Sequence, residues 1–246
     1  MSKGKIRVGI DVNEVLRGRW AAFDRFYLEE FGDENIPEVE MVYDFWKEYV
    51  WKDTVEEEKE MREPEDTPDT INPIDYQTDE KGEAPADFML FKPAMKKTLT
   101  AREVYNRFMY EDYLFEIHGA APKIYPQLDL DTNKFLDKYR DNADFIVMSV
   151  ENRFSIPPTL FFLSKIQMRC NDYKFVDKSI DMWKHVDVLI TTDPEIIKLG
   201  APWGKKLIKL KRPYNIDLKE GTVDVLQLVD LIEDKEFQKI IKYKSK

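Results

Sequence analysis

The chain of 246 residues is long enough for one large or two modest domains with a buried core, and 43% of its residues are apolar. No run approaches the ~18 consecutive apolar residues of a membrane span, and residues 1–5 lack the apolar stretch of a signal peptide. We therefore expect no membrane partner. The single cysteine, Cys170, excludes an internal disulfide and a cysteine-based metal site, which fits a reducing compartment such as the cytoplasm.

The acidity of the chain, a net charge of -10, is concentrated in one segment. Residues 53–87 contain 14 acidic and 3 basic side chains, a net charge of -11, so the rest is close to neutral at about +1. A near-neutral body argues against a general nucleic-acid-binding surface, and we expect no direct nucleic-acid binding. The basic run of residues 205–212 alternates with apolar residues, which predicts a strand with one solvated face.

The first elements in chain order are a strand and an amphipathic helix. Residues 6–10 form an apolar run that is typical of a buried strand. Aromatic residues then recur at spacings of three and four over residues 20–31, which predicts a helix that ends at Gly32. Residues 37–52 hold a dense aromatic group and predict a short helix. Residues 52–87 combine acidic residues with four prolines and predict a flexible arm or a long excursion.

Helical periodicity returns at Thr100. The sequence Thr-Ala-Arg-Glu at residues 100–103 is a capping-box pattern, and it opens a helix predicted to continue to about Glu116. The remaining predicted elements are a helix over residues 131–140, a strand at 144–148, a helix from about 157, strands at 173–176, 186–190 and 207–210, and a final helix over 223–242.

Short apolar strands that alternate with helices predict an α/β fold with a doubly wound, mainly parallel sheet. Ligands of such sheets bind at the carboxyl ends of the strands. Asp11, Ser149 and Thr191 each stand at the end of an apolar run, so we expect them to lie together at one edge of the sheet. The chain between Asp11 and Ser149 is far longer than one crossover connection needs.

Four segments taken in order resemble the signature segments of the haloacid-dehalogenase-like superfamily. They are residues 11–16 after the first strand, Ser149 after the strand at 144–148, Lys178, and residues 188–195. The closest likeness is to the small 5'(3')-deoxyribonucleotidases of cells and large phages. The Pro-Tyr-Asn of residues 213–215 resembles the sequence that closes the core in the phage relatives.

The resemblance implies a role for each matched residue. In that superfamily the first acid of the first segment attacks phosphorus, the acid two residues later transfers protons, and a serine and a lysine hold phosphate oxygens. Asp11 therefore matches the nucleophile, and Ser149 and Lys178 match the phosphate-holding positions. Each match has a plain alternative: Asp11 could cap a turn, and Lys178 could be an exposed loop lysine.

The chain departs from the family pattern at the acids that the chemistry needs. Asn13 stands at the place of the proton-transferring acid, and an amide cannot transfer a proton in this way. Thr191 and Thr192 occupy the places of two acids that bind Mg²⁺ in the family, and Asp193 follows them one or two positions late. Glu14 replaces the usual glycine, where it would crowd the turn or swing in as a substitute acid.

These departures lead to the main hypothesis, a catalytically inactive protein with a structural or assembly role. Under this hypothesis we expect no catalytic residue, no metal and no cofactor. The protein would retain a vestigial phosphatase pocket, made of Asp11, Asn13, Ser149, Lys178 and Asp193. The alternative is a weak or altered Mg²⁺-dependent 5'(3')-deoxyribonucleotidase-like phosphatase, with Asp193 as a displaced metal ligand. A nucleotide-binding sensor without hydrolysis is a third hypothesis.

The resemblance also implies how the chain is divided. Residues 1–32 and 121–246 match the core, and residues 33–120 match the place of a cap-like insertion that includes an acidic arm at 52–90. The arm has too few apolar residues to build a core, so we expect the arm and the cap to contact other protein subunits in a homo-oligomer or a larger assembly. Because related chains are frequent in large phages, a ring, neck or tail protein of a virion is a specific case.

Overall fold

The computed structural model describes four stretches of the chain: residues 5–32, 51, 54–55 and 99–242. The predicted short helix of residues 37–52 and the acidic arm of residues 52–90 lie outside them, except for Trp51, Thr54 and Val55. None of the helices in these stretches has both the length and the apolar character needed to cross a membrane.

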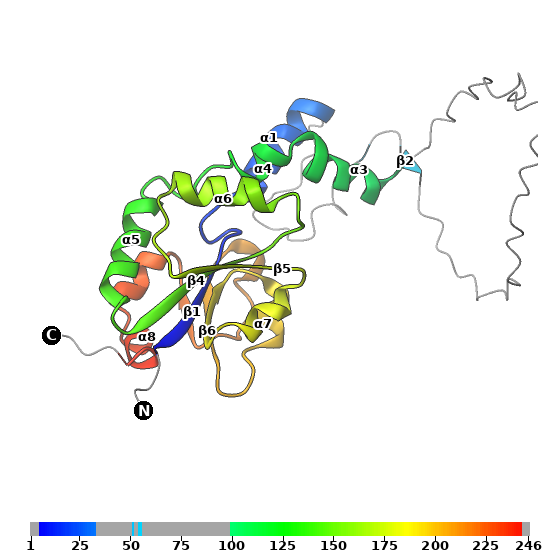
Figure 1. Cartoon of the computed structure of the whole chain (residues 1–246). Helices are drawn as coiled ribbons and strands as arrows, with labels where there is room; N and C mark the ends of the chain where they lie inside the picture. The colour runs from blue at the N-terminus through cyan, green and yellow to red at the C-terminus, as the bar shows by residue number, and fades with distance from the viewer. Residues whose placement is uncertain (1–4, 33–50, 52–53, 56–98, 243–246) are drawn as a thin grey trace, which may run out of the picture.

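A six-stranded sheet forms the centre of the molecule, and all of its neighbouring strands are parallel (Figure 1). In spatial order the strands are β5 (Asp172–Val176), β4 (Ala143–Val150), β1 (Ile6–Asp11), β6 (Val188–Thr191), β7 (Lys206–Leu210) and β8 (Val223–Val225). Five of them were predicted from apolar runs. β1 lies between β4 and β6, so the carboxyl ends of these three strands meet at one edge.

Helices cover both faces of the sheet, because successive strand residues point to opposite faces. Val8 and Ile10 belong to one hydrophobic cluster, and Leu189 belongs to another. The first cluster is covered by α5 (Leu128–Tyr139), α6 (Ile156–Lys165), the 3-10 helix η6 (Leu228–Ile232) and α8 (Lys235–Ile240). The second is covered by the 3-10 helix η4 (Ser179–Lys184) and α7 (Pro194–Leu199). The predicted α/β class with a parallel sheet is confirmed.

A third hydrophobic cluster lies beyond the carboxyl ends of the strands and is largely aromatic. Its elements are α1 (Arg19–Phe31), α3 (Ala101–Arg107), the π-helix η3 (Phe108–Asp112) and α4 (Leu114–His118), which Figure 1 shows grouped together. Phe23 of α1 packs on Phe108 with ring centroids 5.2 Å apart. Trp51 packs edge-on against Tyr27 at 5.5 Å. The predicted apolar stripe of α1 therefore faces residues 101–118 rather than the sheet.

The capping box at Thr100 is confirmed, but the helix that it opens is shorter than predicted. The Thr100 hydroxyl accepts a hydrogen bond from Glu103 N (3.2 Å), and the Glu103 carboxylate accepts one from Thr100 N (3.0 Å). The α-helix ends at Arg107, where a π-turn follows with Tyr113 N bonded to Phe108 O (3.0 Å). Phe108 and Met109 of this turn are both buried.

The predicted final helix over residues 223–242 is wrong in its first part, where a strand and a 3-10 helix occur, and is confirmed only over Lys235–Ile240. The predicted solvated face of β7 is wrong. Val223 and Val225 lie in β8 and are buried against β7, with Asp224 exposed between them. The two-residue period of a strand was hidden by the helical spacing of the apolar residues that follow. On β7, Lys209 is only 1% exposed, because its ammonium group is paired with Asp224 (3.1 Å). β8 therefore covers the lysine that sequence alone placed in solvent.

The short helix α8 closes the core by its aromatic contact with α5. Asp234 begins α8, since its carboxylate accepts a hydrogen bond from Phe237 N (2.6 Å). The Phe237 ring is fully buried, with its centroid 5.5 Å from Phe135 and 5.4 Å from Tyr139.

We predict that Phe237→Ala lowers the free energy of unfolding by about 3–5 kcal/mol, because it leaves a cavity between α5 and α8. Chemical denaturation followed by circular dichroism measures the change. Leu226→Ala is the matched control, since Leu226 is 62% exposed and its truncation should change stability by less than about 0.5 kcal/mol. A loss below about 1 kcal/mol for Phe237→Ala would contradict this packing.

Candidate functional site

A pocket of about 220 Å³ lies at the carboxyl ends of β1 and β6, beneath the helical layer of α1 and α3. The strand ends and their following turns supply its polar floor, and aromatic residues of the helical layer supply its wall. Its lining residues are Asp11, Asn13, Glu14, Arg19, Trp20, Tyr105, Tyr110, Val150, Ser179, Thr192 and Asp193. Three of the five predicted site residues, Asp11, Asn13 and Asp193, are thus brought together.

Asp11 ends β1 and is 5% exposed. One carboxylate oxygen accepts a hydrogen bond from the Thr191 hydroxyl (2.7 Å), and the other accepts one from Asn13 N (3.3 Å). Burial raises the pKa of Asp11 to about 7, and the negative charge of Asp193 adds to this, while the bond from Thr191 opposes it. Burial therefore favours the neutral carboxyl form of Asp11 far more than in an exposed aspartate.

The turn after β6 fixes the direction of the Thr191 hydroxyl. Thr191 Oγ1 accepts a hydrogen bond from Asp193 N (3.0 Å), so its own proton is directed to Asp11. The Asp193 carboxylate is used locally as well: its Oδ1 accepts bonds from Glu195 N (2.8 Å) and Ile196 N (3.4 Å) and caps α7. Asp193 lines the pocket, yet one of its oxygens serves the helix behind it.

Asn13 and Ser149 belong to one hydrogen-bond chain. Asn13 Oδ1 accepts from the Arg17 guanidinium (2.6 Å), which cannot accept, so the Asn13 amide nitrogen faces Ser149 Oγ (3.2 Å). Ser149 Oγ in turn donates to Glu151 Oε1 (2.9 Å). Ser149 is fully buried, and its hydroxyl proton is donated to Glu151, so the hydroxyl does not donate to a group in the pocket.

A buried ion pair lies below these two residues. Arg17 and Glu151 contact each other at 2.7 Å with side chains that are at most 1% exposed. Thr159 donates to the same Glu151 oxygen (2.9 Å), and His118 Nδ1 lies 3.4 Å from the other. Burial works against ionisation of Glu151, but the charge of Arg17 and the His118 contact overcome it and hold its pKa well below the usual range. Burial lowers the pKa of His118 to about 4, so its imidazole is neutral.

Glu14 neither crowds the turn nor lies free in the pocket. Its backbone adopts the left-handed conformation (φ 58°), and its carboxylate accepts a hydrogen bond from Trp20 N in the first turn of α1 (3.1 Å). Arg212 donates to Glu14 O (2.7 Å), and Asn215 donates to Thr192 O (2.9 Å). The Pro-Tyr-Asn segment thus holds the turns after β1 and β6 in place.

Ser149 and Lys178 are the two predicted site residues that do not line the pocket, and Lys178 is the more distant from its chemistry. It precedes η4 and its side chain is exposed, whereas the next residue, Ser179, lines the pocket. Among the residues that the structure describes, no lysine lines the pocket, and Arg19 is the one cationic residue in the lining.

The residues at the strand ends do not fit a Mg²⁺ ion, which prefers an octahedral set of oxygen ligands. Thr191 presents a hydroxyl donor to Asp11 where a metal site needs an acceptor, and the Asp193 carboxylate caps α7. Within residues 5–32, 51, 54–55 and 99–242, no group of three or more histidine, cysteine or acidic side chains is placed to hold a metal.

Sequence reasoning missed the buried group below the site and the aromatic wall above it. Arg17 and Glu151 are charged residues within or next to apolar runs, and that contrast was the available signal. His118 carried no usable signal, because its burial depends on packing against Tyr110, whose ring lies 5.5 Å away.

Comparisons with protein-family models and with curated proteins find no match to this chain. The α/β architecture and the geometry of the strand ends are therefore what characterise the site.

The pH dependence of the free energy of unfolding should reveal that His118 is buried as a neutral imidazole. Its pKa is about 6.5 in the unfolded chain and about 4 in the folded one, so between these values the unfolded state binds more protons and stability falls as the pH falls. Asp11 acts in the opposite direction, because its folded pKa is raised. We predict that His118→Gln gains about 3 kcal/mol relative to the unmodified protein between pH 7 and pH 4.

Urea denaturation at pH 7, 5.5 and 4 measures this difference. Leu130→Ala is the control, because it changes an exposed side chain and no titratable group. If the gap between His118→Gln and the unmodified protein stays constant with pH, the neutral buried imidazole is contradicted.

Proposed function

We propose that this chain is a catalytically inactive haloacid-dehalogenase-like protein that acts as a structural or assembly component. The observation that carries the proposal is the hydrogen bond from Thr191 to Asp11 (2.7 Å). A carboxylate that attacks phosphorus needs a cation beside it to offset the charge of the phosphate dianion. Here its neighbour is a neutral hydroxyl whose direction is fixed by Asp193 N, and burial favours the neutral form of the Asp11 carboxyl group.

The phosphate-holding side of the pocket supports the same proposal. A serine holds a phosphate oxygen by donating its proton, but the Ser149 proton goes to Glu151. Lys178 is exposed and outside the pocket lining, so it does not supply charge at the strand ends. Asn13 is held between Arg17 and Ser149, and its amide offers no proton transfer. The polar groups stabilise one another instead of facing a ligand.

The assembly role is supported by the composition of the acidic arm. Residues 53–87 carry a net charge of -11 and are poor in apolar residues, a composition that gains order by contact with a partner. A ring, neck or tail protein of a virion is a specific form of this role; a cytoplasmic assembly is the general one.

One observation favours the alternative, a Mg²⁺-dependent 5'(3')-deoxyribonucleotidase-like phosphatase. Asp11, Glu14 and Asp193 all border the same pocket, so three acidic residues lie around a common space, although their carboxyl groups do not converge as a metal site. Two of them are engaged with helix N-termini, through Trp20 N and Glu195 N, which would have to be released before either could bind a metal.

We predict that the purified protein does not hydrolyse deoxynucleoside monophosphates or p-nitrophenyl phosphate with Mg²⁺ above background. Asn13→Asp alone should not restore activity, because the metal side of the site is still missing. Phosphate release is the measurement, and Asp11→Asn is the control that identifies contaminating enzyme. Turnover at about 1 s⁻¹ or faster that Asp11→Asn abolishes would establish the alternative.

We also predict that removing residues 57–86 leaves the core folded but changes the assembly. The deletion retains Thr54 and Val55, which form the short strand β2 and pair with β3 (Leu99–Thr100). Melting temperature reports on the core, and sedimentation velocity reports on the mass of the assembly. Unchanged mass, or an unfolded chain, would contradict a role of the arm in assembly.

A further inference from the structure

The carboxylate of Asp193 has one oxygen to which no described group donates a hydrogen bond. Asp193 is 4% exposed, and its Oδ1 accepts the bonds from Glu195 N and Ile196 N that cap α7. Within residues 5–32, 51, 54–55 and 99–242, Oδ2 receives no such bond. Because Asp193 lines the pocket while Oδ1 faces the helix, Oδ2 is the oxygen left for the pocket. A carboxylate oxygen removed from bulk water needs a donor.

Asp11 presents a second carboxyl group to the same space. Its two oxygens accept one hydrogen bond each, from the Thr191 hydroxyl (2.7 Å) and from Asn13 N (3.3 Å). A carboxylate can accept about four, so Asp11 retains acceptor capacity on the pocket side. The charge of Asp193 acts on Asp11, so the two groups lie close enough to repel each other when both are ionised.

The pocket is one positive charge short of neutrality. Its lining contains three acidic residues, Asp11, Glu14 and Asp193, and one cationic residue, Arg19. The Arg19 guanidinium carbon lies 4.4 Å from the centroid of the adjoining indole, and its charge stabilises the Glu14 carboxylate. A second cation, Arg212, donates to Glu14 O (2.7 Å) from outside the lining. Two cations thus stand against three acids.

The neighbouring charges do not supply the missing cation. Arg17 and Glu151 form a closed pair at 2.7 Å, so they add no net charge. Asp177 and Lys178 are both exposed, lie outside the lining and have opposite signs. A ligand with a single positive charge would therefore balance the pocket.

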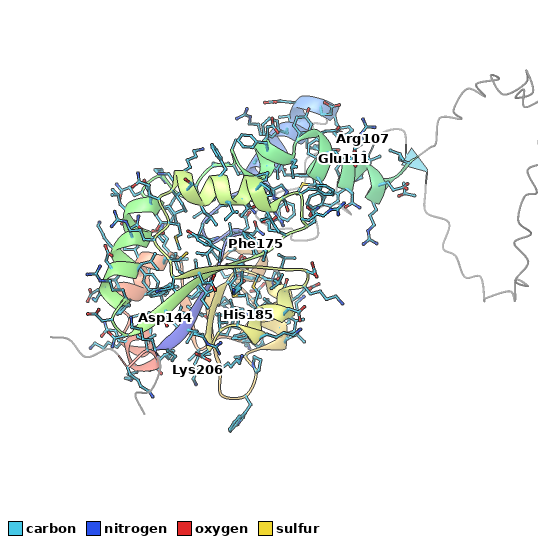
Figure 2. The ribbon with its side chains drawn as sticks, viewed as in Figure 1. Arg107, Glu111, Asp144, Phe175, His185 and Lys206 are labelled. Atoms are coloured by element: carbon cyan, nitrogen blue, oxygen red, sulfur yellow. The ribbon has the colours of Figure 1, made fainter. Side chains whose placement is uncertain are left out.

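Two layers of the fold enclose the pocket and limit its size. Figure 2 shows Arg107 and Glu111 on the helical layer, on the side of the sheet away from Asp144 and Lys206, which lie near the amino ends of β4 and β7. The helical layer thus lies over the carboxyl ends of the strands. The pocket volume of about 220 Å³ is below the roughly 300–1,000 Å³ of sites for drug-sized ligands, so its ligand must be small.

The wall of the pocket is aromatic. Trp20, Tyr105 and Tyr110 line it opposite the polar floor. Aromatic rings attract organic cations through their negative faces and also pack against aliphatic carbon. The pocket therefore combines hydrogen-bond acceptors, a deficit of positive charge and an apolar wall.

We propose that this pocket binds a small organic ammonium ion. Its N–H groups donate to Asp193 Oδ2 and to Asp11, and its aliphatic part lies against the aromatic wall. Hydrogen bonds between an ammonium group and a carboxylate are among the strong ones, because both partners are charged. The inference goes beyond the assembly role proposed above and does not depend on it.

The same groups suit an ammonium ion better than Mg²⁺ or phosphate. Mg²⁺ requires a near-octahedral set of oxygen ligands, and the described residues contain no converging group of three acidic, histidine or cysteine side chains. An ammonium ion requires only acceptors, which two carboxylates provide. A phosphate dianion would meet three acidic residues in the lining.

The test uses three ligands of the same length and different charge: butylammonium, butanol and butyrate. Nuclear magnetic resonance titration of the full-length protein, at an ionic strength of about 0.15 M to screen surface charge, measures binding. We expect saturable binding of butylammonium with a dissociation constant of about 1 mM or lower, and no saturable binding of the other two.

Two variants locate the bound ion. Asp193→Asn removes the charge but retains a cap for α7, since asparagine caps helices as well as aspartate does. Asp11→Asn removes the charge on the other side. Each should weaken butylammonium binding at least about tenfold, because each removes a charged hydrogen-bond acceptor. Asp177→Asn is the matched control: it removes the same charge at an exposed site outside the lining and should retain the affinity.

Other outcomes would overturn the inference. Unchanged binding in both pocket variants would place the ion elsewhere, for example on the acidic arm. Equal binding of butanol would show that charge is not recognised, and absence of saturation at about 10 mM would exclude the site. The melting temperature shows whether each variant is folded, and Asp11→Asn decides alone if Asp193→Asn unfolds. Displacement of butylammonium by Mg²⁺ at lower concentration would favour a metal site instead.

Discussion

The buried guanidinium of Arg17 constrains most of what surrounds the strand ends. A charge taken out of water costs several kcal/mol unless it is paired and fully hydrogen-bonded. The two terminal nitrogens of the Arg17 guanidinium meet this requirement with Glu151 (2.7 Å), Asn13 (2.6 Å), the backbone oxygen of His118 (2.6 Å) and Thr159 (2.8 Å), whereas its Nε is buried without such a bond. These partners come from the segments that follow β1 and β4 and from α4 and α6, so one ion holds the sheet edge and the helical layer together.

The same constraint explains why the polar groups near the pocket are poorly placed for phosphate chemistry. Glu151 must balance Arg17, and as an acceptor it draws the protons of Ser149 and Thr159. Asn13 lines the pocket, but its side-chain oxygen is bonded to Arg17 and is therefore not available to a ligand. A fold can be kept for its shape when its site chemistry is lost. A structural network of this kind is consistent with the assembly role proposed here.

Much of the fold could be predicted from sequence, because periodicity is a local property. Apolar runs located five of the six strands, and the capping box at Thr100 marked a helix start that the structure confirms. The failures occurred where a local pattern was ambiguous. Val223 and Val225 fit both a strand and the start of a helix, and only pairing with β7 selects the strand. The sequence predicts that Lys209 is exposed to solvent, and only the neighbouring strand β8, which carries Asp224, buries it.

By itself the sequence determined which residue types stand at the strand ends: an acid at Asp11, an amide at Asn13 and a hydroxyl at Thr191. Only the tertiary structure decided what these groups do, since Asn13 bonds to Ser149 and Asp11 to Thr191 across 136 and 180 residues of chain. It also decided that Lys178 stays outside the pocket whereas Asp193 lines it. Element type follows from neighbouring residues, whereas burial, proton direction and surface position depend on distant segments that meet only in the folded chain.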